Sequence, residues 1–211
     1  MSASRSLPSL RRLRVASLVI RRTVPGGRAA VAVVVARVAG RTLPPPDMSA
    51  SSWTPAWIGL GSNLDDPPRQ LDAATAALAR LPETRLIAIA RRYGSDPVGP
   101  QDQPRFLNTV VSVLTTLDAS ALHAALRAAE QELGKVAPVV RFGPRRIDLD
   151  LLAYGQAVLQ TETLTLPHPR LHERAFVLYP LAELAPDLWI PGRGRVATLK
   201  AAVRGDGLTL Q

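Results

Sequence analysis

Apolar positions between residues 56 and 154 follow two different periods. Continuous or alternating apolar runs rich in Val, Ile and Leu, which are typical of β-strands, occur at residues 56–61, 86–93, 106–117 and 147–154. Apolar residues three or four positions apart, which are typical of amphipathic helices, occur at residues 71–81 and 122–133. The order strand, helix, strand, strand, helix, strand predicts an α+β fold. We expect a ferredoxin-like two-layer sandwich, in which an antiparallel or mixed sheet carries the helices packed on it.

Residues at the ends of these segments support the assignment. Asp66 followed by Pro67, and Asp118 before the second helical segment, are suitable N-caps. Gly134 is suited to the end of the second helix. Residues 94–104 contain three prolines and two glycines and predict a long ordered loop. The chain after residue 159 predicts only loops and short helices.

The basic charge of the chain is concentrated near its start. The chain has 211 residues, no cysteine and a net charge of +9. Residues 1–47 hold nine of its 26 basic side chains but only one of its 17 acidic ones, so residues 48–211 carry a net charge of only +1. This distribution disfavours a nucleic-acid-binding role for the main part of the chain. The absence of cysteine excludes disulfides, thiolate metal sites and cysteine nucleophiles.

Residues 1–47 form a leader rich in Ser, Arg, Ala and Val. Its apolar run at residues 29–36 is too short to span a bilayer. Three interpretations stay open: a translation start upstream of the true start at Met48, an acid-poor transit peptide, or a disordered basic tail. We favour the first, because a self-sufficient domain begins close to Met48. We expect residues 48–211 to form the catalytic domain.

The most informative local feature is the pair Asp148 and Asp150, separated by one leucine within an apolar strand. Because side chains alternate across a strand, the two aspartates share one face and repel each other unless cations lie between them. Magnesium suits such a pair, since it takes oxygen ligands and leaves room for phosphate oxygens. Taken alone, the pair is better explained as two solvated acids on an exposed strand face than as a metal site. Arg141, Arg145 and Arg146, which precede it, favour a site for a metal-bound nucleotide instead.

Two further groups of residues suit a small-molecule site. Phe106 and Asn108 point to the same side of their strand and suit a heterocycle, although a core Phe and an edge Asn are the more common explanation. His168 can bind a phosphate or a base edge, or be an ordinary surface or core histidine. The chain lacks a Gly-x-x-x-x-Gly-Lys-Ser/Thr phosphate loop, the protein-kinase signatures and a Gly-x-Ser-x-Gly elbow. A nucleotide enzyme of this size therefore has to bind phosphates through Arg, Lys, His and metal.

Taken in order, five segments resemble the 6-hydroxymethyl-7,8-dihydropterin pyrophosphokinase family. They are residues 61–63, 98–104, 106–108, 141–150, and Pro167-His168 with Arg174 and Phe176. The resemblance implies an ATP-dependent enzyme of folate biosynthesis, which transfers a diphosphate from ATP to the hydroxymethyl group of the pterin and releases AMP. It also implies a pair of Mg²⁺ ions, small-molecule substrates rather than nucleic acid or membrane, and a cytoplasmic monomer.

The resemblance also assigns roles to individual residues. The catalytic group is Lys135, Arg145, Asp148 and Asp150, and both aspartates hold the metal. The pterin site is Ser95, Asp96, Val98, Phe106, Asn108 and Phe176, with the two phenylalanines on either side of the ring. The ATP site is Glu130, Arg141, Arg145, Leu151, His168 and Arg174. Catalysis then rests on positioning and charge stabilisation, with no covalent intermediate.

Several positions depart from the family's usual pattern. Lys135-Val136-Ala137 stands where Arg-x-Arg is usual, so one charge lacks the guanidinium fork and another is lost. Phe142 replaces a common Trp, Ser95-Asp96 a usual Thr-Pro, and Phe106 a frequent Tyr. Because the metal and pterin positions survive, we expect an active enzyme. The alternatives are an idle relative that binds ATP or pterin, and a basic nucleic-acid-binding module that acts through the leader.

Overall fold

The computed structural model describes residues 37–38, 41–42, 52–136 and 142–211. The chain divides into two compact units, Met1–Asp47 and Met48–Gln211. In the first unit, β1 (Arg37–Val38) pairs antiparallel with β2 (Arg41–Thr42). Every other described element belongs to the second unit. Among the described residues, no helix has the length and apolar character needed to cross a membrane.

One antiparallel sheet organises the second unit, with the strand order β12-β5-β6-β3-β7 and with β4 paired to β6 beside β5. Its strands are β3 (Thr54–Ser62), β4 (Thr84–Ile89), β5 (Tyr93–Ser95), β6 (Phe106–Thr115), β7 (Asp148–Tyr154) and β12 (Thr209–Leu210). At ten residues, β6 is long enough to pair with β4 near one end and with β5 near the other. This is the strand arrangement of a ferredoxin-like fold, and the α+β prediction is confirmed.

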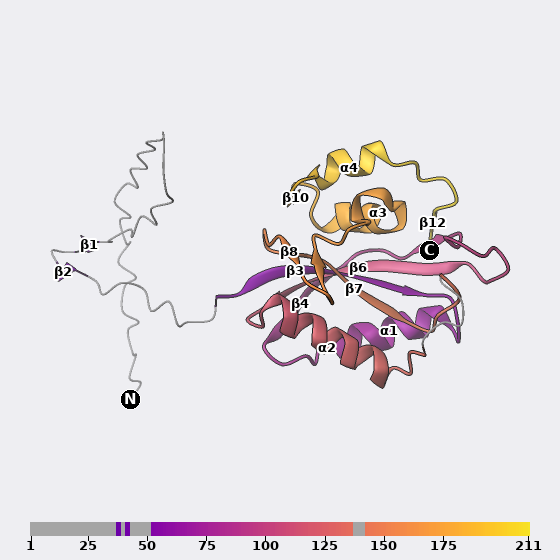
Figure 1. The fold of residues 1–211 in the computed structure, drawn as a ribbon, viewed down its shortest axis with the longest axis horizontal. Coiled ribbons are helices and arrows are strands. Elements are labelled where there is room, and N and C mark those ends of the chain that lie inside the picture. Colours follow the sequence, from indigo (N-terminus) through magenta and orange to yellow (C-terminus); the bar gives the residue numbers. More distant parts are fainter. Residues whose placement is uncertain (1–36, 39–40, 43–51, 137–141) are drawn as a thin grey trace, which may run out of the picture. The chain divides into compact units, whose positions relative to one another are not determined.

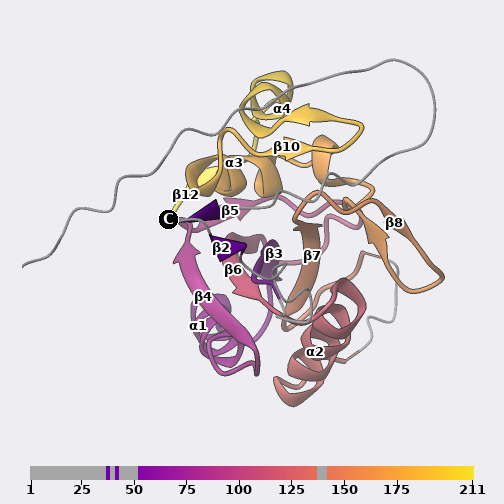
Figure 2. The ribbon, with the colours of Figure 1, turned by 90° about the vertical axis from the view of Figure 1, so that its left-hand side faces the viewer.

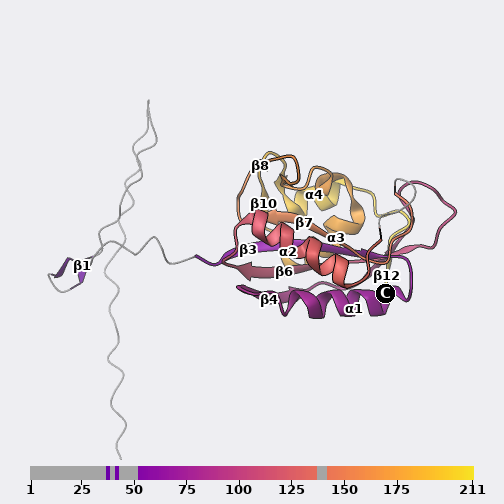
Figure 3. The same ribbon diagram turned by 60° about the horizontal axis from the view of Figure 1, so that its bottom comes forward.

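Two helices cover one face of the sheet (Figures 1 and 3). α1 (Pro67–Leu78) begins after Asp66, whose carboxylate accepts a hydrogen bond from a first-turn N–H at 3.3 Å. α2 (Ala119–Glu132) begins after Asp118, which accepts a corresponding bond at 2.8 Å. Both predicted N-caps are confirmed. With the sheet, the two helices enclose the first apolar core, which includes Ala56, Ile58, Leu60, Leu71, Leu78, Val111, Leu122, Leu126 and Leu149.

The opposite face is covered by α3 (Ala175–Leu184) and α4 (Val196–Ala202), so that Figure 2 shows the sheet between two helical layers. A second apolar core lies beneath these helices and includes Trp57, Val110, Leu152, Leu178, Leu181 and Ile190. The sequence predicted only loops and short helices in this part of the chain. The bounds of α3 could not be predicted, because α3 is apolar at nearly every position and contains Pro180, and both features obscure the helical period.

The strand predicted at residues 86–93 is two strands in the structure. β4 ends at Ile89, and β5 runs from Tyr93 to Ser95, into the segment predicted as loop. Ser95 thereby joins the sheet and lies opposite Phe106. The remaining short elements are β8 (Leu159–Gln160), β9 (Thr165–Leu166), the 3-10 helix η1 (Leu171–Glu173), β10 (Trp189–Ile190) and β11 (Gly194–Arg195).

The alternation of side chains along β3 connects the fold to a cavity. Ile58 and Leu60 belong to the first core, and Trp57 belongs to the second. Gly59 and Gly61 share the face of Trp57 but lie beyond the second core, where they line a cavity between the sheet and α3.

Candidate active site

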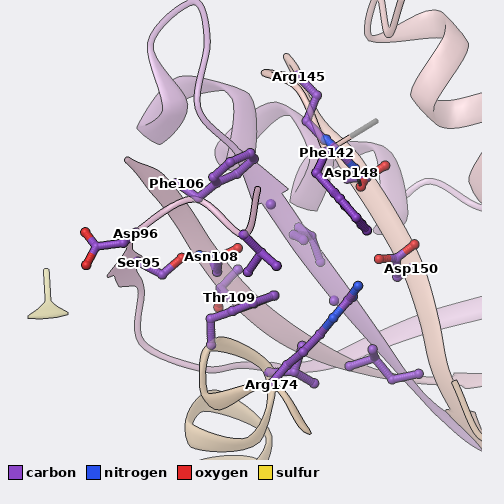
Figure 4. Close-up of a pocket in the computed structure, with 17 residues that line it drawn as sticks. Ser95, Asp96, Phe106, Asn108, Thr109, Phe142, Arg145, Asp148, Asp150 and Arg174 are labelled. Atoms are coloured by element: carbon purple, nitrogen blue, oxygen red, sulfur yellow. Dashed lines mark hydrogen bonds and ion pairs between the residues drawn. The ribbon is translucent and has the colours of Figure 1, made fainter. Parts of the chain in front are cut away.

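Asp148 and Asp150 share one face of β7, as the strand period predicts, and both line the cavity (Figure 4). The intervening Leu149 is fully buried in the first core. In the register of the sheet, Asp148 lies opposite Gly61 of β3, and Asp150 lies opposite Gly59. The two carboxylates therefore border a strip of the sheet that has no side chains.

The cavity brings together residues from β3, β5, β6, β7, α3 and the loops between them. It includes ten residues that were predicted to act in the site: Ser95, Asp96, Val98, Phe106, Asn108, Arg145, Asp148, Asp150, Arg174 and Phe176. The other lining residues were not predicted as site residues: Gly59, Leu60, Gly61, Thr109, Phe142, Leu152 and Val177. Of the remaining predicted residues, Arg141 lies outside the described part of the chain. Ala137, which stands where the family usually has Arg, also lies outside it.

Gly59 and Gly61 keep the floor of the cavity low. A Cβ on Gly61 would lie 3.1 Å from Oδ1 of Asn108, and a Cβ on Gly59 would lie 3.4 Å from Cδ2 of Leu152. The space between the aspartate pair and Asn108 therefore depends on glycine at position 61. The sequence does contain a signal for it, because glycine inside a strand often marks the close approach of a ligand.

Asn108 is buried and held in one orientation at the end of the cavity away from Asp150. Its Nδ2 donates to Oγ of Ser95 at 2.9 Å and to the backbone carbonyl of Tyr93 at 3.4 Å. Phe106 lies opposite Ser95 in the sheet, and its side chain also borders the cavity. An apolar wall beside an oriented amide suits a flat heterocycle with a hydrogen-bonding edge.

Asn63 and Gln103 tie the loops around the cavity together. Nδ2 of Asn63 donates to Oε1 of Gln103 at 3.0 Å and to the carbonyl of Pro104 at 2.9 Å, while Oδ1 accepts from the backbone N–H of Arg145 at 2.8 Å. Nε2 of Gln103 donates to the carbonyl of Phe142 at 2.9 Å. These two amides therefore position the loop before β6 and the loop before β7 relative to β3.

Asp148 is paired with two side-chain cations. Nζ of Lys135 lies 2.5 Å from its Oδ1, and Nη1 of Arg145 lies 2.6 Å from its Oδ2. Burial by itself would raise the pKa of Asp148, but Lys135 and Arg145 outweigh burial and hold that pKa below its usual range. The carboxylate is therefore ionised at neutral pH and available as an oxygen ligand.

Glu130 lies beneath this pair and holds Lys135 in place. Its side chain is 2% exposed, and Nζ of Lys135 lies 2.7 Å from its Oε1. The backbone N–H of Leu149 donates to Oε1 at 2.6 Å, and Nη1 of Arg127 lies 2.8 Å from Oε2. Burial raises the pKa of Glu130, against the opposing effects of Lys135, Leu149 and Arg127. Glu130 was predicted from the resemblance as an ATP-site residue. In the structure, its carboxylate is paired with Lys135, Leu149 and Arg127 within the protein.

A second hollow lies against Asp150 and is lined by Leu151 and His168, two residues of the predicted ATP site. The backbone N–H of Arg170 donates to Nδ1 of His168 at 3.2 Å, which leaves Nε2 to carry the proton of the neutral ring. Burial lowers the pKa of His168, and Asp150 opposes that shift. Asp150 also lines the first cavity, so the two hollows meet at this carboxylate.

Arg174 and Arg170 add positive charge on the α3 side of the cavity. Burial lowers the pKa of Arg174, and Asp150 opposes that shift. The buried Nε of Arg174 has no hydrogen-bond partner among the residues that the structure describes, and its Cζ lies 5.6 Å from the ring centroid of Phe176. Arg170, which sequence reasoning missed, places its Cζ 5.7 Å from the ring centroid of Phe142. An anionic group such as a phosphate suits these donors.

Asp148 and Asp150 fit a hard divalent cation such as Mg²⁺. Within residues 52–136 and 142–211, no cluster of three or more His, Asp or Glu side chains is placed to hold a metal. A pair of carboxylates leaves most of an octahedral shell to water and phosphate oxygens, which is the coordination that Mg²⁺ prefers in nucleotide enzymes. The donor set therefore suits a metal that arrives with a phosphate ligand.

Comparison with known proteins places this site in a family. The model of the family described as 7,8-dihydro-6-hydroxymethylpterin-pyrophosphokinase (HPPK) matches residues 57–186. A 2-amino-4-hydroxy-6-hydroxymethyldihydropteridine pyrophosphokinase of Pseudomonas aeruginosa is 48% identical over 152 residues, which cover 72% of this chain and 93% of that protein. The enzyme of the same name from Haemophilus influenzae is 45% identical over 136 residues, which cover 64% and 84% of the two chains.

More distant relatives agree in fold. The folic acid synthesis protein fol1 of Schizosaccharomyces pombe is 38% identical over 136 residues, but this match covers only 18% of that protein. A solved structure of Plasmodium falciparum HPPK-DHPS superposes with a TM-score of 0.57 at 12% identity, covering 73% of this chain and 46% of that chain. At this identity the likeness shows the fold, and the chain spans about half the length of that structure.

Proposed function

The chain belongs to the 7,8-dihydro-6-hydroxymethylpterin-pyrophosphokinase family, and from this premise we propose how its cavity performs the family's reaction. The chain transfers a diphosphate from ATP to the hydroxymethyl group of 6-hydroxymethyl-7,8-dihydropterin, a step of folate synthesis. One observation carries the proposal. A single cavity holds an oriented amide between apolar walls at one end and a pair of carboxylates among cationic side chains at the other.

The reaction joins the two ends of the cavity. The hydroxymethyl oxygen of the pterin attacks the β-phosphorus of ATP, and the bond from that phosphorus to the oxygen bridging to the α-phosphorus breaks. AMP leaves with that bridging oxygen, and the hydroxyl proton passes to solvent. No covalent enzyme intermediate is needed, so the protein contributes by holding the attacking oxygen and the phosphorus in line and by stabilising charge.

The pterin occupies the end of the cavity near Asn108 and Ser95. Phe106 and Phe176 flank the ring, and the fixed amide of Asn108 addresses its hydrogen-bonding edge. The glycine strip on β3 lets the ring lie close to the sheet, with its hydroxymethyl group directed toward Asp148.

The triphosphate occupies the cationic end of the cavity. Arg145 and Arg174 line the cavity, and Arg174 offers to a phosphate oxygen a buried Nε that has no hydrogen-bond partner within the described part of the chain. Lys135, which Glu130 holds beside Asp148, supplies a point charge there. The nucleoside extends into the second hollow, where Leu151 and His168 lie.

Asp148 and Asp150 hold Mg²⁺ when it is bound, and the ion neutralises phosphate charge and fixes the geometry of the triphosphate. Asp148 is kept ionised by Lys135 and Arg145, so it does not have to lose a proton before it becomes a ligand. Arg145 contacts Asp148 and lines the same cavity, so it is placed to move from the carboxylate to a phosphate oxygen.

The proposal extends to the organisation of the chain. The described residues that line the cavity all lie within residues 48–211, so this part acts as the catalytic unit, and residues 1–47 are dispensable for catalysis. Because these lining residues belong to one chain, a monomer suffices. A cytoplasmic location fits an enzyme whose co-substrate is ATP.

The test is an assay of the full chain with ATP, Mg²⁺ and 6-hydroxymethyl-7,8-dihydropterin in which AMP and ADP are resolved. We expect AMP only when pterin and metal are both present, and we expect Asp150→Asn to abolish it. Asp187→Asn is the matched control, because Asp187 is an exposed acid in a surface ion pair with Arg195. ADP as the product would contradict diphosphate transfer. Binding of both ligands without any nucleotide product would identify an idle relative.

A further inference from the structure

The last seven residues of the chain pack against the strand that carries Ser95. β12 extends the sheet at β5, with Thr209 opposite Gly94 and Leu210 opposite Tyr93. The backbone N–H of Gln211 donates to the carbonyl of Arg92 at 3.0 Å. Figure 1 shows the C-terminus beside β12, near β6. Residues 205–211, here called the C-terminal strap, thus cover the outer edge of the pterin end of the cavity.

Arg105 fastens the strap to the cavity wall. Its Nε donates to Oδ1 of Asp96 at 2.8 Å, its Nη1 donates to Oγ1 of Thr209 at 3.3 Å, and its Nη2 donates to the carbonyl of Gly207. Arg105 directly precedes Phe106 of β6, so one side chain links β6, the strap and the segment after β5. Asp96 borders the cavity, but its carboxylate points away from it (Figure 4). That carboxylate therefore faces the strap and not the cavity.

The strap and the segment at residues 94–96 are in such close contact that a displacement of one would shift the other. A Cβ on Gly94 would lie 2.7 Å from Oγ1 of Thr209, and a Cβ on Gly207 would collide with the carboxylate of Asp96. Gly207 also has a φ of +73°, in the left-handed region that favours glycine. Two glycines on opposite sides of the contact thus allow the strap and the segment at residues 94–96 to meet without a gap.

We propose that the C-terminal strap, locked through Arg105, is a positioning element that sets the affinity for the heterocyclic substrate by holding the segment from Ser95 to Val98 in place. The inference rests on the proposed function, because it assumes that this end of the cavity binds the pterin. Ser95 receives the hydrogen bond that orients Asn108, so a shift of β5 moves both groups. The ATP end is built from β7, α3 and their loops. The strap meets α3 at Gly205, where an added Cβ would lie 2.5 Å from Oη of Tyr179, but Tyr179 is not among the residues that line the cavity.

The test compares Arg105→Met, Arg105→Lys and a chain that stops after Asp206 with the wild-type full chain. Arg195→Met is the matched control, because it removes an exposed Arg–Asp ion pair at β11, away from the cavity. Equilibrium binding of pterin and of ATP, steady-state KM and kcat, and the thermal midpoint are measured for each protein. Arg105→Lys keeps a charge for Asp96 but loses the fork to the strap, so it should fall between wild type and Arg105→Met.

We expect Arg105→Met to weaken pterin binding about three- to fivefold, since the Arg105–Asp96 pair is largely exposed. The truncation should weaken it about tenfold, because a misplaced substrate-positioning segment is costly. The ATP affinity of each strap variant should equal that of the wild type. Arg195→Met should bind both ligands as the wild type does. The proposal for the strap would be overturned if pterin binding and ATP binding weakened equally. It would also be overturned if the truncated protein bound pterin as tightly as the wild type. A wild-type chain that forms no AMP would instead refute the proposed function, so the two failures are distinguishable.

Discussion

Replacing Asp148 with Asn should destabilise the protein more than replacing Asp150 with Asn, although both changes should abolish diphosphate transfer. Asp148 has Lys135 and Arg145 within 2.5 and 2.6 Å. Among the described residues, the ion-pair partner of Asp150 is Arg127, whose Nη2 lies 3.7 Å from Oδ1, beyond hydrogen-bonding distance. The repulsion between two adjacent acids, taken alone, would make both replacements stabilising.

The magnitude follows from burial and contact geometry. Asp148, Lys135 and Arg145 have side-chain exposures of 19%, 18% and 21%, so solvent screens their interactions only in part. A hydrogen bond to a charged group contributes about 1.5–3 kcal/mol. Asn keeps a weaker acceptor, and the cost of burying the carboxylate is recovered, so a net loss of about 2 kcal/mol is reasonable. For Asp150, which is 35% exposed, a loss of about 0.5 kcal/mol or less is expected.

Thermal and urea unfolding in metal-free buffer at neutral pH measure this difference. For a chain of this size, about 2 kcal/mol corresponds to a decrease of roughly 4–8 °C in the thermal midpoint. Asp187→Asn controls for the loss of a surface carboxylate, and AMP release is measured on the same preparations. If Asp150→Asn lowers the midpoint as much as Asp148→Asn, or if Asp148→Asn leaves it unchanged, the assignment of Lys135 and Arg145 as stabilising partners is wrong.

Three other changes test the two ends of the site and an ion pair outside it. Gly61→Ala places a Cβ 3.1 Å from Oδ1 of Asn108 and should raise the pterin KM about tenfold with little change in the ATP KM, as steady-state kinetics would show. Arg174→Lys loses the guanidinium fork and should weaken ATP binding about tenfold in calorimetry, leaving pterin affinity unchanged. Burial would raise the pKa of Glu183, but Arg91 and Tyr93 together outweigh burial and lower that pKa. The stability contributed by Glu183 is therefore present above the ordinary Glu pKa and lost as the pH falls through the lower folded value, so the difference in thermal midpoint between wild type and Glu183→Gln should shrink in acid.

Lys135 shows how a departure in sequence acquires a structural explanation. The sequence alone indicated that this position retains a charge but lacks the guanidinium fork. In the structure, Nζ of Lys135 lies between Glu130 and Asp148, at 2.7 and 2.5 Å. The compact ammonium of Lys135 thus reaches both carboxylates as a point charge, without a planar fork. The buried Glu130 that holds Lys135 is separated from Asp148 by 18 positions, so this link could not be read from local pattern.

Local rules determined much of the fold. The two N-caps, the order of the strands and helices, and the common face of Asp148 and Asp150 each depend on spacing within one segment. The same rules predicted short helices after residue 159 but gave no bounds for α3, because a helix that is apolar nearly all round carries no period to detect.

By itself, the sequence determined the main strands and helices between residues 54 and 154, which of their residues share a face, and which family the motifs resemble, because each of these follows from neighbouring positions. Only the tertiary structure decided that Gly59 and Gly61 form the floor opposite the aspartates, and that Arg105 binds a strap more than 100 positions away. Strand register and contacts between distant segments result from packing of the whole sheet, and a one-residue slip would turn each glycine to the other face. The residues proposed for the site were predicted from local patterns and from a family resemblance, whereas their placement around one cavity was decided by the fold.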